Sequence, residues 1–463
     1  MDFSQATFWL VVLPAFALLA LGNCLLKNRI AFQKIFILAL SLLLLGVACW
    51  QTLFIFLSVA LGGYGFCLLG VRLSVRGRRV LMCFLIPLLL APLAYYKYGY
   101  FIGENLFMQE WASLKALVIP IGISFYSFQV IAFCIDTLMR NEPMPRFLDY
   151  MNFCAFFPQI VAGPIERRRD LLPQISTPKM MLCAADLNIG IRYIVLGLFF
   201  KMALADNLAL AFVTGYRGES AWVVWLNNIL FTFRIYFDFG GYAMTAYGIA
   251  RCLGITLRLN FLSPYTACNI GDFWRRWHTS LMQWFRDYVY IPLGGGRTRL
   301  WAVNVLGVFL ISGLWHGAGW NFLIWGALSG VAVVGYRLFV KSGGHLWAPL
   351  GWGLTFGLMV FVWMFFYDTD AEVLRHHLTT LTTLSSYRFG EFIATLKALR
   401  VQGALAIAFI PLSFLVIAVE AVSLRCRGDA YSLFLTVPAC ALMVFLTVVL
   451  QASADSLFIY FSF

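Results

Sequence analysis

The chain has 463 residues, of which 62% are hydrophobic and only 12% carry a charge. This composition excludes a soluble globular domain and a disordered chain, because both need far more polar surface. It indicates a protein that crosses a lipid bilayer many times. The formal net charge of +13 therefore has to be explained within a membrane protein.

Apolar segments recur along the chain at a length that suits membrane-spanning helices. We predict an all-α integral membrane protein with about 11–13 transmembrane helices, since about 20 apolar residues cross the hydrocarbon as a helix. The first segment lacks a basic leader and a small-residue cleavage pattern, so we expect a retained helix. The predicted spans are 8–26, 35–50, 52–71, 80–96, 116–138, 186–213, 221–250, 301–318, 320–340, 349–367, 402–424 and 431–451.

Two segments do not fit simple spanning helices. Residues 147–175 begin as an apolar stretch that Pro158, Gly163 and Pro164 interrupt. Broken apolar backbone at membrane depth is tolerated only where protein buries it or it lines a cavity. Residues 258–299 are too charged to span the bilayer and too rich in Trp and Tyr for a free loop. We predict that both are re-entrant or interfacial elements.

The basic residues fall mainly in the loops of one side. With the N-terminus placed outside, most of the 34 Lys and Arg residues lie in loops that the positive-inside rule assigns to the cytoplasm. The net charge therefore reflects topology, and we expect no nucleic-acid partner. A second reading, left open, is that this basic face also attracts an anionic acyl donor. The location predicted is a cytoplasmic (inner) membrane, with an extracytoplasmic N-terminus.

The 11 cysteines occur singly, with no Cys-x-x-Cys pair and no His/Cys cluster. We interpret them as small apolar packing residues and predict neither a metal site nor a disulfide.

Two histidines lie in dense aromatic settings and are the predicted catalytic residues. They are His278, which ends Phe-Trp-Arg-Arg-Trp-His, and His316, in Gly-Leu-Trp-His-Gly. An ionisable group in or beside an apolar span is costly and points to function. Imidazole is also the side chain best suited to proton transfer near neutral pH. The remaining histidines (His345, His376 and His377) are predicted at the surface of polar connectors.

Two further features, Asp238 and the glycine run 294–296, have two readings each. Asp238 follows Arg234 by one helical turn, so the two side chains either pair with each other or line a passage. The glycines at 294–296 either form a plain turn or contact donor phosphates beside arginines, although no Lys-Ser/Thr follows as in a Walker loop.

Several motifs in unbroken order, from about residue 95 to the C-terminus, resemble the membrane-bound O-acyltransferase (MBOAT) family. Within that family they look most like the bacterial polysaccharide O-acetyltransferases that act in alginate, cellulose and peptidoglycan acetylation. The motifs are Gly122-Ile-Ser-Phe-Tyr126, Phe157-Pro-Gln-Ile-Val-Ala-Gly-Pro-Ile-Glu-Arg167, Tyr236-Phe-Asp-Phe239, Phe273-Trp-Arg-Arg-Trp-His278, Arg286-Asp-Tyr288, Tyr290-Ile-Pro-Leu-Gly-Gly295, Ser312-Gly-Leu-Trp-His-Gly-Ala318 and Phe458-Ile-Tyr-Phe461.

The resemblance implies a core with a central tunnel, open to donor on the cytoplasmic side and to acceptor outside. His316 matches the near-invariant histidine of the family, and His278 matches its second polar position. We expect three regions: N-terminal helices 1–115, the catalytic core 116–345, and C-terminal helices 346–463 with an extracytoplasmic segment at 368–400. Candidate substrate or tunnel residues are Tyr236, Asp238, Trp274, Arg275, Arg276, Trp315 and Asn304, and candidates for donor phosphates are Arg167, Arg286 and Arg297.

The implied reaction passes acetyl from acetyl-CoA or an acyl-carrier thioester toward an exported polysaccharide, with no bound cofactor. A separate extracytoplasmic acetyltransferase or a polysaccharide synthase is the expected partner. D-alanyl transfer to teichoic acid is an alternative, although that branch usually has Asp where this chain has Glu166. A non-enzymatic transporter would explain the spans but not the histidine motifs.

Overall fold

The computed structural model describes residues 3–109, 112–115, 117–212, 216–452 and 458–459. The described residues form helices and connecting segments, without strands. They group into two compact units, each built from separate stretches of chain. Unit 1 comprises residues 1–194 and 245–259, and unit 2 comprises residues 195–244 and 260–463. The division into regions 1–115, 116–345 and 346–463 stays a prediction, because each of these regions is one continuous stretch, whereas each compact unit joins separate stretches.

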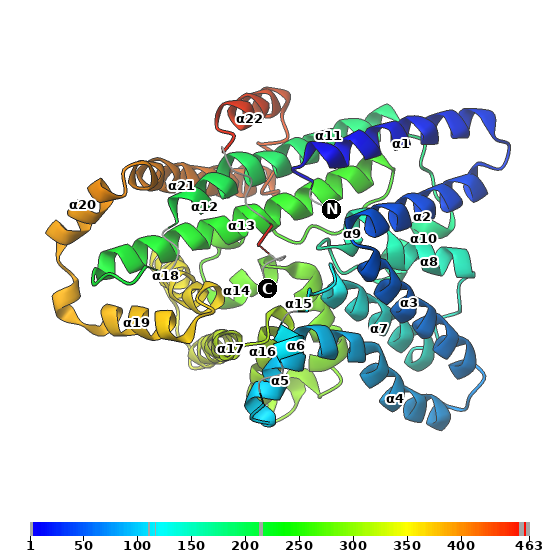
Figure 1. Ribbon diagram of the computed structural model, residues 1–463, viewed down its shortest axis with the longest axis horizontal. Coiled ribbons are helices and arrows are strands. Elements are labelled where there is room, and N and C mark those ends of the chain that lie inside the picture. The colour runs from blue at the N-terminus through cyan, green and yellow to red at the C-terminus, as the bar shows by residue number, and fades with distance from the viewer. Residues whose placement is uncertain (1–2, 110–111, 116, 213–215, 453–457, 460–463) are drawn as a thin grey trace. The chain divides into compact units, whose positions relative to one another are not determined.

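Unit 1 is a set of apolar helices with short irregular elements packed against them (Figure 1). Helix α7 packs on α3 and α4, and α8 packs on α2 and α10. The elements are α1 (Ala6–Leu25), α2 (Arg29–Ala48), α3 (Trp50–Gly70), α4 (Val75–Leu93), η1 (Ala94–Tyr98), α5 (Gly99–Leu106), α6 (Ala112–Lys115), α7 (Ile123–Met139), α8 (Phe147–Ala155), α9 (Phe157–Ile160), α10 (Arg168–Ser176) and most of α11 (Ala184–Leu198).

Unit 2 contains both catalytic candidates. Helix α16 packs along α17, α17 packs on α18, and α12 packs on α21. The elements are η2 (Phe199–Ala205), α12 (Asp206–Ala211), most of α13 (Ala221–Cys252), η3 (Pro264–Thr266), α14 (Ile270–Arg276), α15 (Thr279–Phe285), η4 (Arg286–Tyr290), η5 (Gly295–Arg297), α16 (Trp301–His316), α17 (Trp320–Lys341), α18 (Ala348–Tyr367), α19 (Ala371–Thr382), η6 (Leu384–Ser386), α20 (Phe389–Ala398), α21 (Val401–Arg427) and α22 (Val437–Val449).

Eight helices of the described chain are long and apolar enough to cross a membrane. They are Ala6–Leu25, Arg29–Ala48, Trp50–Gly70, Val75–Leu106, Ala184–Ala211, Trp320–Lys341, Ala348–Tyr367 and Val401–Arg427. Three shorter apolar helices are α7, α16 and α22. The 32-residue α13, which carries Arg234 and Asp238, is not among either set. The predicted all-α membrane fold is confirmed.

Two predicted spans begin later than expected. The helix predicted at 116–138 begins at Ile123, because Pro120 precedes it and Gly122 adopts φ +73°, a conformation that other residues rarely take. Residue 116 lies outside the described residues. The helix predicted at 431–451 begins at Val437, with Pro438 in its first turn.

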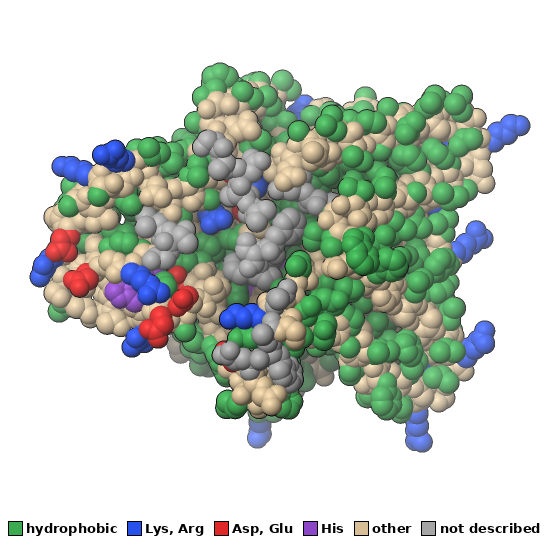
Figure 2. Space-filling view, in the orientation of Figure 1, with side chains coloured by type: hydrophobic (Ala, Val, Ile, Leu, Met, Phe, Trp, Pro, Cys, Tyr) green, Lys and Arg blue, Asp and Glu red, His purple; other side chains and the backbone are tan. Residues whose placement is uncertain are grey.

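Hydrophobic side chains cover the exposed sides of the N-terminal helices, as a lipid-facing surface requires (Figure 2). Within unit 1, the α1–α2 and α3–α4 turns lie on one edge (Figure 1). Lys27 and Arg29 are exposed at the first turn, and Arg72 and Arg76 at the second. The basic turns of this unit therefore share a side.

The central part of the broken segment 147–175 is buried within unit 1, and its re-entrant placement stays a prediction. Residues 156–168 are all buried. The side chain of Gln159 donates to Gln129 on α7, and the backbone N–H of Phe157 donates to Ser41 Oγ at 3.2 Å. Glu166 accepts a 2.6 Å bond from the backbone N–H of Arg258, and burial raises the pKa of this carboxyl to about 7. Polar bonds thus hold this irregular backbone inside protein.

Candidate active site

The helix pair that carries His316 is tightly packed. A methyl group added at Gly313 would lie 2.3 Å from the backbone oxygen of Phe322, and one added at Gly326 would lie 2.4 Å from that of Phe309. Only glycine lets the two backbones come this close. The crossing fixes the last turn of α16, and His316 is its final residue.

His316 is 4% exposed and surrounded by aromatic rings. Its ring centroid lies 4.8 Å from that of Trp315, 5.1 Å from Trp325 and 5.2 Å from Phe366, each in an edge-to-face arrangement. These rings limit the access of water to the imidazole. Trp315, a predicted substrate or tunnel residue, contacts His316, and its role in a tunnel stays a prediction.

His278 occupies a strained turn between α14 and α15. Its φ of +43° is in the left-handed region, which is uncommon for residues other than glycine. The neighbouring backbone is fixed by two bonds to the segment after α13: Leu262 N–H donates to Arg276 O at 3.0 Å, and Thr279 N–H donates to Asn260 O at 2.9 Å. Such strain persists only where the surroundings enforce it, and it is frequent at functional sites.

The imidazole of His278 is 1% exposed. It packs edge-on against Phe239 at 4.8 Å and against Trp315 at 5.9 Å between ring centroids. Burial lowers the pKa of His278 to about 3, so this ring is neutral at physiological pH. Trp315 therefore touches both histidines, which lie in one aromatic cluster.

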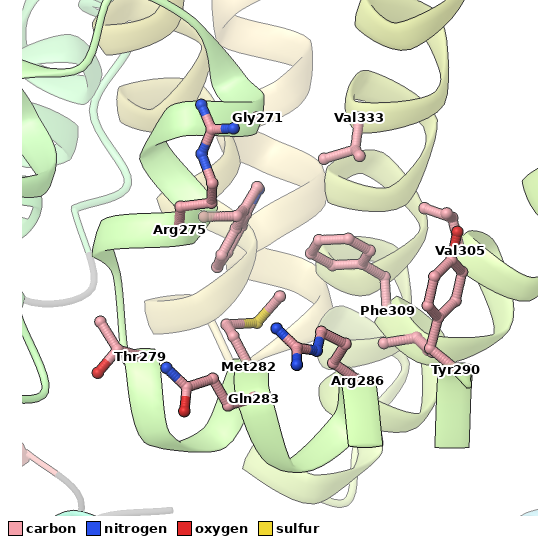
Figure 3. A pocket seen from close by; sticks show the side chains of 12 residues that line it. Gly271, Arg275, Thr279, Met282, Gln283, Arg286, Tyr290, Val305, Phe309 and Val333 are labelled. Atoms are coloured by element: carbon pink, nitrogen blue, oxygen red, sulfur yellow. The ribbon is translucent and has the colours of Figure 1, made fainter. Parts of the chain in front are cut away.

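A cavity of about 460 Å³ opens beside this cluster (Figure 3). Arg275, Thr279 and Arg286 line it from α14, α15 and η4, and Phe309 lines it from α16. The other lining residues are Gly271, Trp274, Met282, Gln283, Tyr290, Val305, Val308 and Val333.

Trp274 connects this cavity with the histidine cluster. Its ring packs edge-on against Trp325 at 5.7 Å, and Trp325 in turn contacts His316. Two indole rings thus stand between the cavity and His316. The buried Nε1 atoms of Trp274 and Trp325 have no hydrogen-bond partner among the described residues.

Of the arginines predicted to contact donor phosphates, not all line the cavity. Arg286 lines the cavity, and so does Arg275, a tunnel candidate. Arg297 is exposed and does not line it, while Arg167 is 4% exposed within unit 1. Arg276 contacts Asp272 at 2.7 Å and donates to Thr266 at 3.0 Å, and the same Asp272 contacts Arg275 at 3.3 Å.

Asn304 organises the glycine turn. Its Nδ2 donates to the backbone oxygens of Leu293 and Gly295, at 3.0 and 3.3 Å. Gly294 and Gly295 both adopt positive φ, of 93° and 58°. These bonds support the plain-turn reading of residues 294–296.

Asp238 is fully buried, and its carboxylate is paired. It contacts Lys201 Nζ at 2.9 Å and accepts the backbone N–H of Ile459 at 2.7 Å. Lys201 also contacts Asp206 at 2.8 Å. Of the two readings of Asp238, the ion pair with Arg234 is not the one that the described residues show, since the partner Lys201 comes from η2, which no local spacing reveals. The tunnel-lining reading stays a prediction. Tyr460 and Phe461 of the terminal motif lie outside the described residues.

Tyr236 is also fully buried, and its hydroxyl is engaged. It donates to Glu420 on α21 at 2.6 Å and lies 3.2 Å from the hydroxyl of Tyr431. Glu420 was not among the predicted site residues. An acidic residue inside an otherwise apolar segment was the signal that pointed to it.

His377 is 1% exposed, so its predicted surface position is wrong. Nδ1 lies 2.6 Å from Asp368 Oδ2, and Nε2 lies 2.8 Å from the backbone oxygen of Tyr216. Burial disfavours the charged imidazole, but Asp368 outweighs it and raises the pKa of His377. Burial raises the pKa of Asp368 as well. His345 is exposed, as predicted.

Cysteine burial is mixed. Cys67, Cys134, Cys154 and Cys252 are buried, as packing residues should be, whereas Cys24, Cys83, Cys183, Cys268 and Cys426 are exposed. In the described part of the chain, no group of three or more His, Cys, Asp or Glu residues is arranged to hold a metal ion.

A multi-pass helical membrane protein with two buried histidines beside a basic cavity has the features of an acyl-transfer enzyme. The sequence comparisons agree, because residues 36–365 match the membrane-bound O-acyltransferase family, and the chain belongs to this family. The resemblance inferred from the motifs is confirmed, and with it the assignment as an acyltransferase.

Similar proteins come from several bacteria. Peptidoglycan O-acetyltransferase of Helicobacter pylori is 35% identical over 317 residues, which cover 60% of each chain. The match thus spans less than two thirds of that relative. The probable alginate O-acetylase AlgI of Pseudomonas putida is 32% identical over 89% of this chain and 87% of its own. Teichoic acid D-alanyltransferase of Bacillus subtilis is 31% identical over 56% of this chain and 71% of its own.

Proposed function

We propose that this protein moves acetyl groups from a cytoplasmic thioester toward an exported polysaccharide, with His316 as the catalytic base. The observation that carries the proposal is the buried imidazole of His316 at the end of a rigid helix pair, close to a basic cavity. The relatives named for peptidoglycan and alginate acetylation supply the substrate class.

The reaction needs one proton transfer. His316 takes the proton of the acceptor hydroxyl, and the oxygen of that hydroxyl attacks the thioester carbonyl. The new C–O bond forms, the C–S bond breaks, and the proton leaves on the released thiol. His278 supports the site as a neutral side chain, because its pKa of about 3 keeps it uncharged during the reaction.

The cavity suits the donor. Arg275 and Arg286 line a pocket whose other walls are mainly apolar. Each guanidinium contacts a neighbouring carboxylate, Asp272 at 3.3 Å and Asp287 at 3.0 Å, but is exposed enough to reach a donor phosphate. Acetyl-CoA and an acyl-carrier thioester both combine phosphate groups with a slender pantetheine arm, and such a pocket fits that combination. We place this face in the cytoplasm and the acceptor at the opposite end of a tunnel.

The proposed partner is an extracytoplasmic acetyltransferase that completes the transfer to sugar, or a polysaccharide synthase. Residues 368–400, with the amphipathic α19, are the proposed docking segment. The proposed location is the bacterial inner membrane.

The decisive experiment restores the gene to a deletion strain and measures ester-linked acetate on the exported polymer. We expect wild type to restore acetylation and His316→Ala to abolish it at equal protein level in the membrane. Full acetylation by a well-expressed His316→Ala variant would reject the proposed base. Incorporation of D-alanine in place of acetate would assign the chain to the teichoic acid branch.

Sidedness has its own test. Thr279 is only 7% exposed, so a label there would report burial rather than topology. Leu384 is 90% exposed in the 368–400 segment, and Arg297 is exposed in the segment that we propose to be cytoplasmic. In a variant without the exposed cysteines, Leu384→Cys should react with an impermeant thiol reagent on intact cells, and Arg297→Cys only after permeabilisation. The reverse pattern would invert the proposed topology.

A further inference from the structure

Glu420 is a buried acidic residue within an apolar spanning helix, and the acyl-transfer chemistry above makes no use of it. Its side chain is fully buried on α21, beyond the part of the chain that matches the family. Tyr236 Oη and Ser263 Oγ each donate to its carboxylate, at 2.6 Å. A carboxylate in such a place is costly, so its retention calls for a function.

The second of these bonds leads to the backbone beside His278. Ser263 adopts φ +53°, the left-handed region that His278 also adopts. Its N–H donates to Tyr431 Oη at 3.3 Å, and Tyr431 Oη donates to the backbone oxygen of Phe261 at 3.0 Å. Glu420 and Tyr431 therefore hold both ends of the short segment 261–263.

That segment in turn fixes the turn at His278. Leu262 N–H binds Arg276 O and Asn260 O binds Thr279 N–H, so segment 260–262 brackets His278 on both sides. The ring of Phe261 packs edge-on against Trp277 at 5.0 Å and lies 6.4 Å from His278. A shift of this segment has to move His278.

Tyr236 completes the support from the other side. Its ring packs against Phe261 at 5.8 Å and against Trp277 at 6.4 Å, while its hydroxyl binds Glu420. The hydroxyl of Tyr236 thus connects the motif Tyr236-Phe-Asp-Phe239 with Glu420 on α21.

We infer that Glu420 is a positioning residue for acyl transfer: it holds segment 260–263, and through it the strained backbone of His278, by accepting hydrogen bonds from Tyr236 and Ser263. The inference rests on the acyl-transfer function proposed above. It assigns Glu420 no contact with substrate.

The test compares three variants in purified protein reconstituted in lipid nanodiscs, with acetyl-CoA as donor. Glu420→Ala removes both acceptors, Ser263→Ala removes one donor, and Glu420→Gln keeps one acceptor and offers an amide to the second hydroxyl. The matched control is Ser413→Ala on the same helix, whose equally buried hydroxyl binds only its own helix at Phe409 O.

We expect Glu420→Ala to lower kcat about tenfold to a hundredfold, because displacements of about 1 Å in an active site have effects of that size. KM for acetyl-CoA should stay within about twofold. Ser263→Ala should also lower kcat without changing KM, but by a smaller factor. Glu420→Gln should recover most of kcat, and Ser413→Ala should match wild type.

A second readout is independent of activity. Carbethoxylation of His278, followed by mass spectrometry, should be slow in wild type, where the ring is 1% exposed, and faster in Glu420→Ala. Wild-type kcat and wild-type labelling of His278 in a folded Glu420→Ala variant would overturn the inference. Labelling that rises in Glu420→Ala supports it even if wild type transfers no acetyl, a result that would reject only the proposed function.

Discussion

The α16–α17 crossing permits a sharp test of how precisely His316 must be held. Gly313 lies three residues before His316, and a methyl group there would stand 2.3 Å from Phe322 O. Real contacts of this kind are essentially never shorter than 3.0 Å. Gly313→Ala therefore has to separate the two backbones by the difference, close to 0.7 Å, at the turn that carries the catalytic ring.

Displacements of about 1 Å commonly reduce turnover about a hundredfold, so we expect kcat to fall between about tenfold and a hundredfold. The assay is acetyl transfer by reconstituted protein, normalised to the amount that is folded and monodisperse. Gly307→Ala is the matched control, since it lies in the same helix with nothing within 4 Å of the added methyl group. It should retain activity and slightly favour the helix. A Gly313→Ala protein with wild-type kcat would refute the claim that this crossing sets the geometry of the site.

Three further predictions concern charge and protonation. Replacing Arg275 and Arg286 with Gln should raise KM for acetyl-CoA and make this KM less dependent on salt, while kcat stays constant. Steady-state kinetics at low and high salt would measure both constants. A change in kcat alone would contradict the proposed binding of the donor by these arginines. His278→Ala should leave measurable transfer, since a supporting group contributes about 10²–10⁴-fold; complete loss, equal to that of His316→Ala, would give His278 a direct role. Because ionised Asp368 raises the pKa of His377, the folded state binds more protons than the unfolded state, so thermal stability should fall as pH rises from 6.5 through the pKa of folded His377; His377→Gln should remove this slope, and an unchanged slope would exclude the pair.

Hydropathy was sufficient to predict most of the spanning helices, because long apolar runs have few alternatives to a membrane helix. It failed at residues 117–122, where Pro120 and Gly122 delay the start of α7 in an otherwise apolar stretch. The strongest functional signal was equally local: the two histidines stand out within their own motifs, and both are buried in one aromatic cluster.

Contacts between distant parts of the chain could not be predicted in this way. Asp238 pairs with Lys201 rather than with its neighbour on the helix, since the partner depends on how η2 packs. His377 lies in a polar segment yet is buried against the backbone of Tyr216, because tertiary packing and not local polarity decides burial. The role inferred for Glu420 depends on its hydrogen bonds with Ser263 and Tyr236, which lie far from it in the sequence.

His316 is proposed to serve as the base for acetyl transfer from a thioester. The most direct test of this role is a single-turnover measurement with radiolabelled acetyl-CoA and purified protein in nanodiscs, in the presence of acceptor polysaccharide and any partner transferase. We expect wild type to release free thiol and label the acceptor, and His316→Ala to do neither while still binding acetyl-CoA. Label transfer by His316→Ala at the wild-type rate would contradict it.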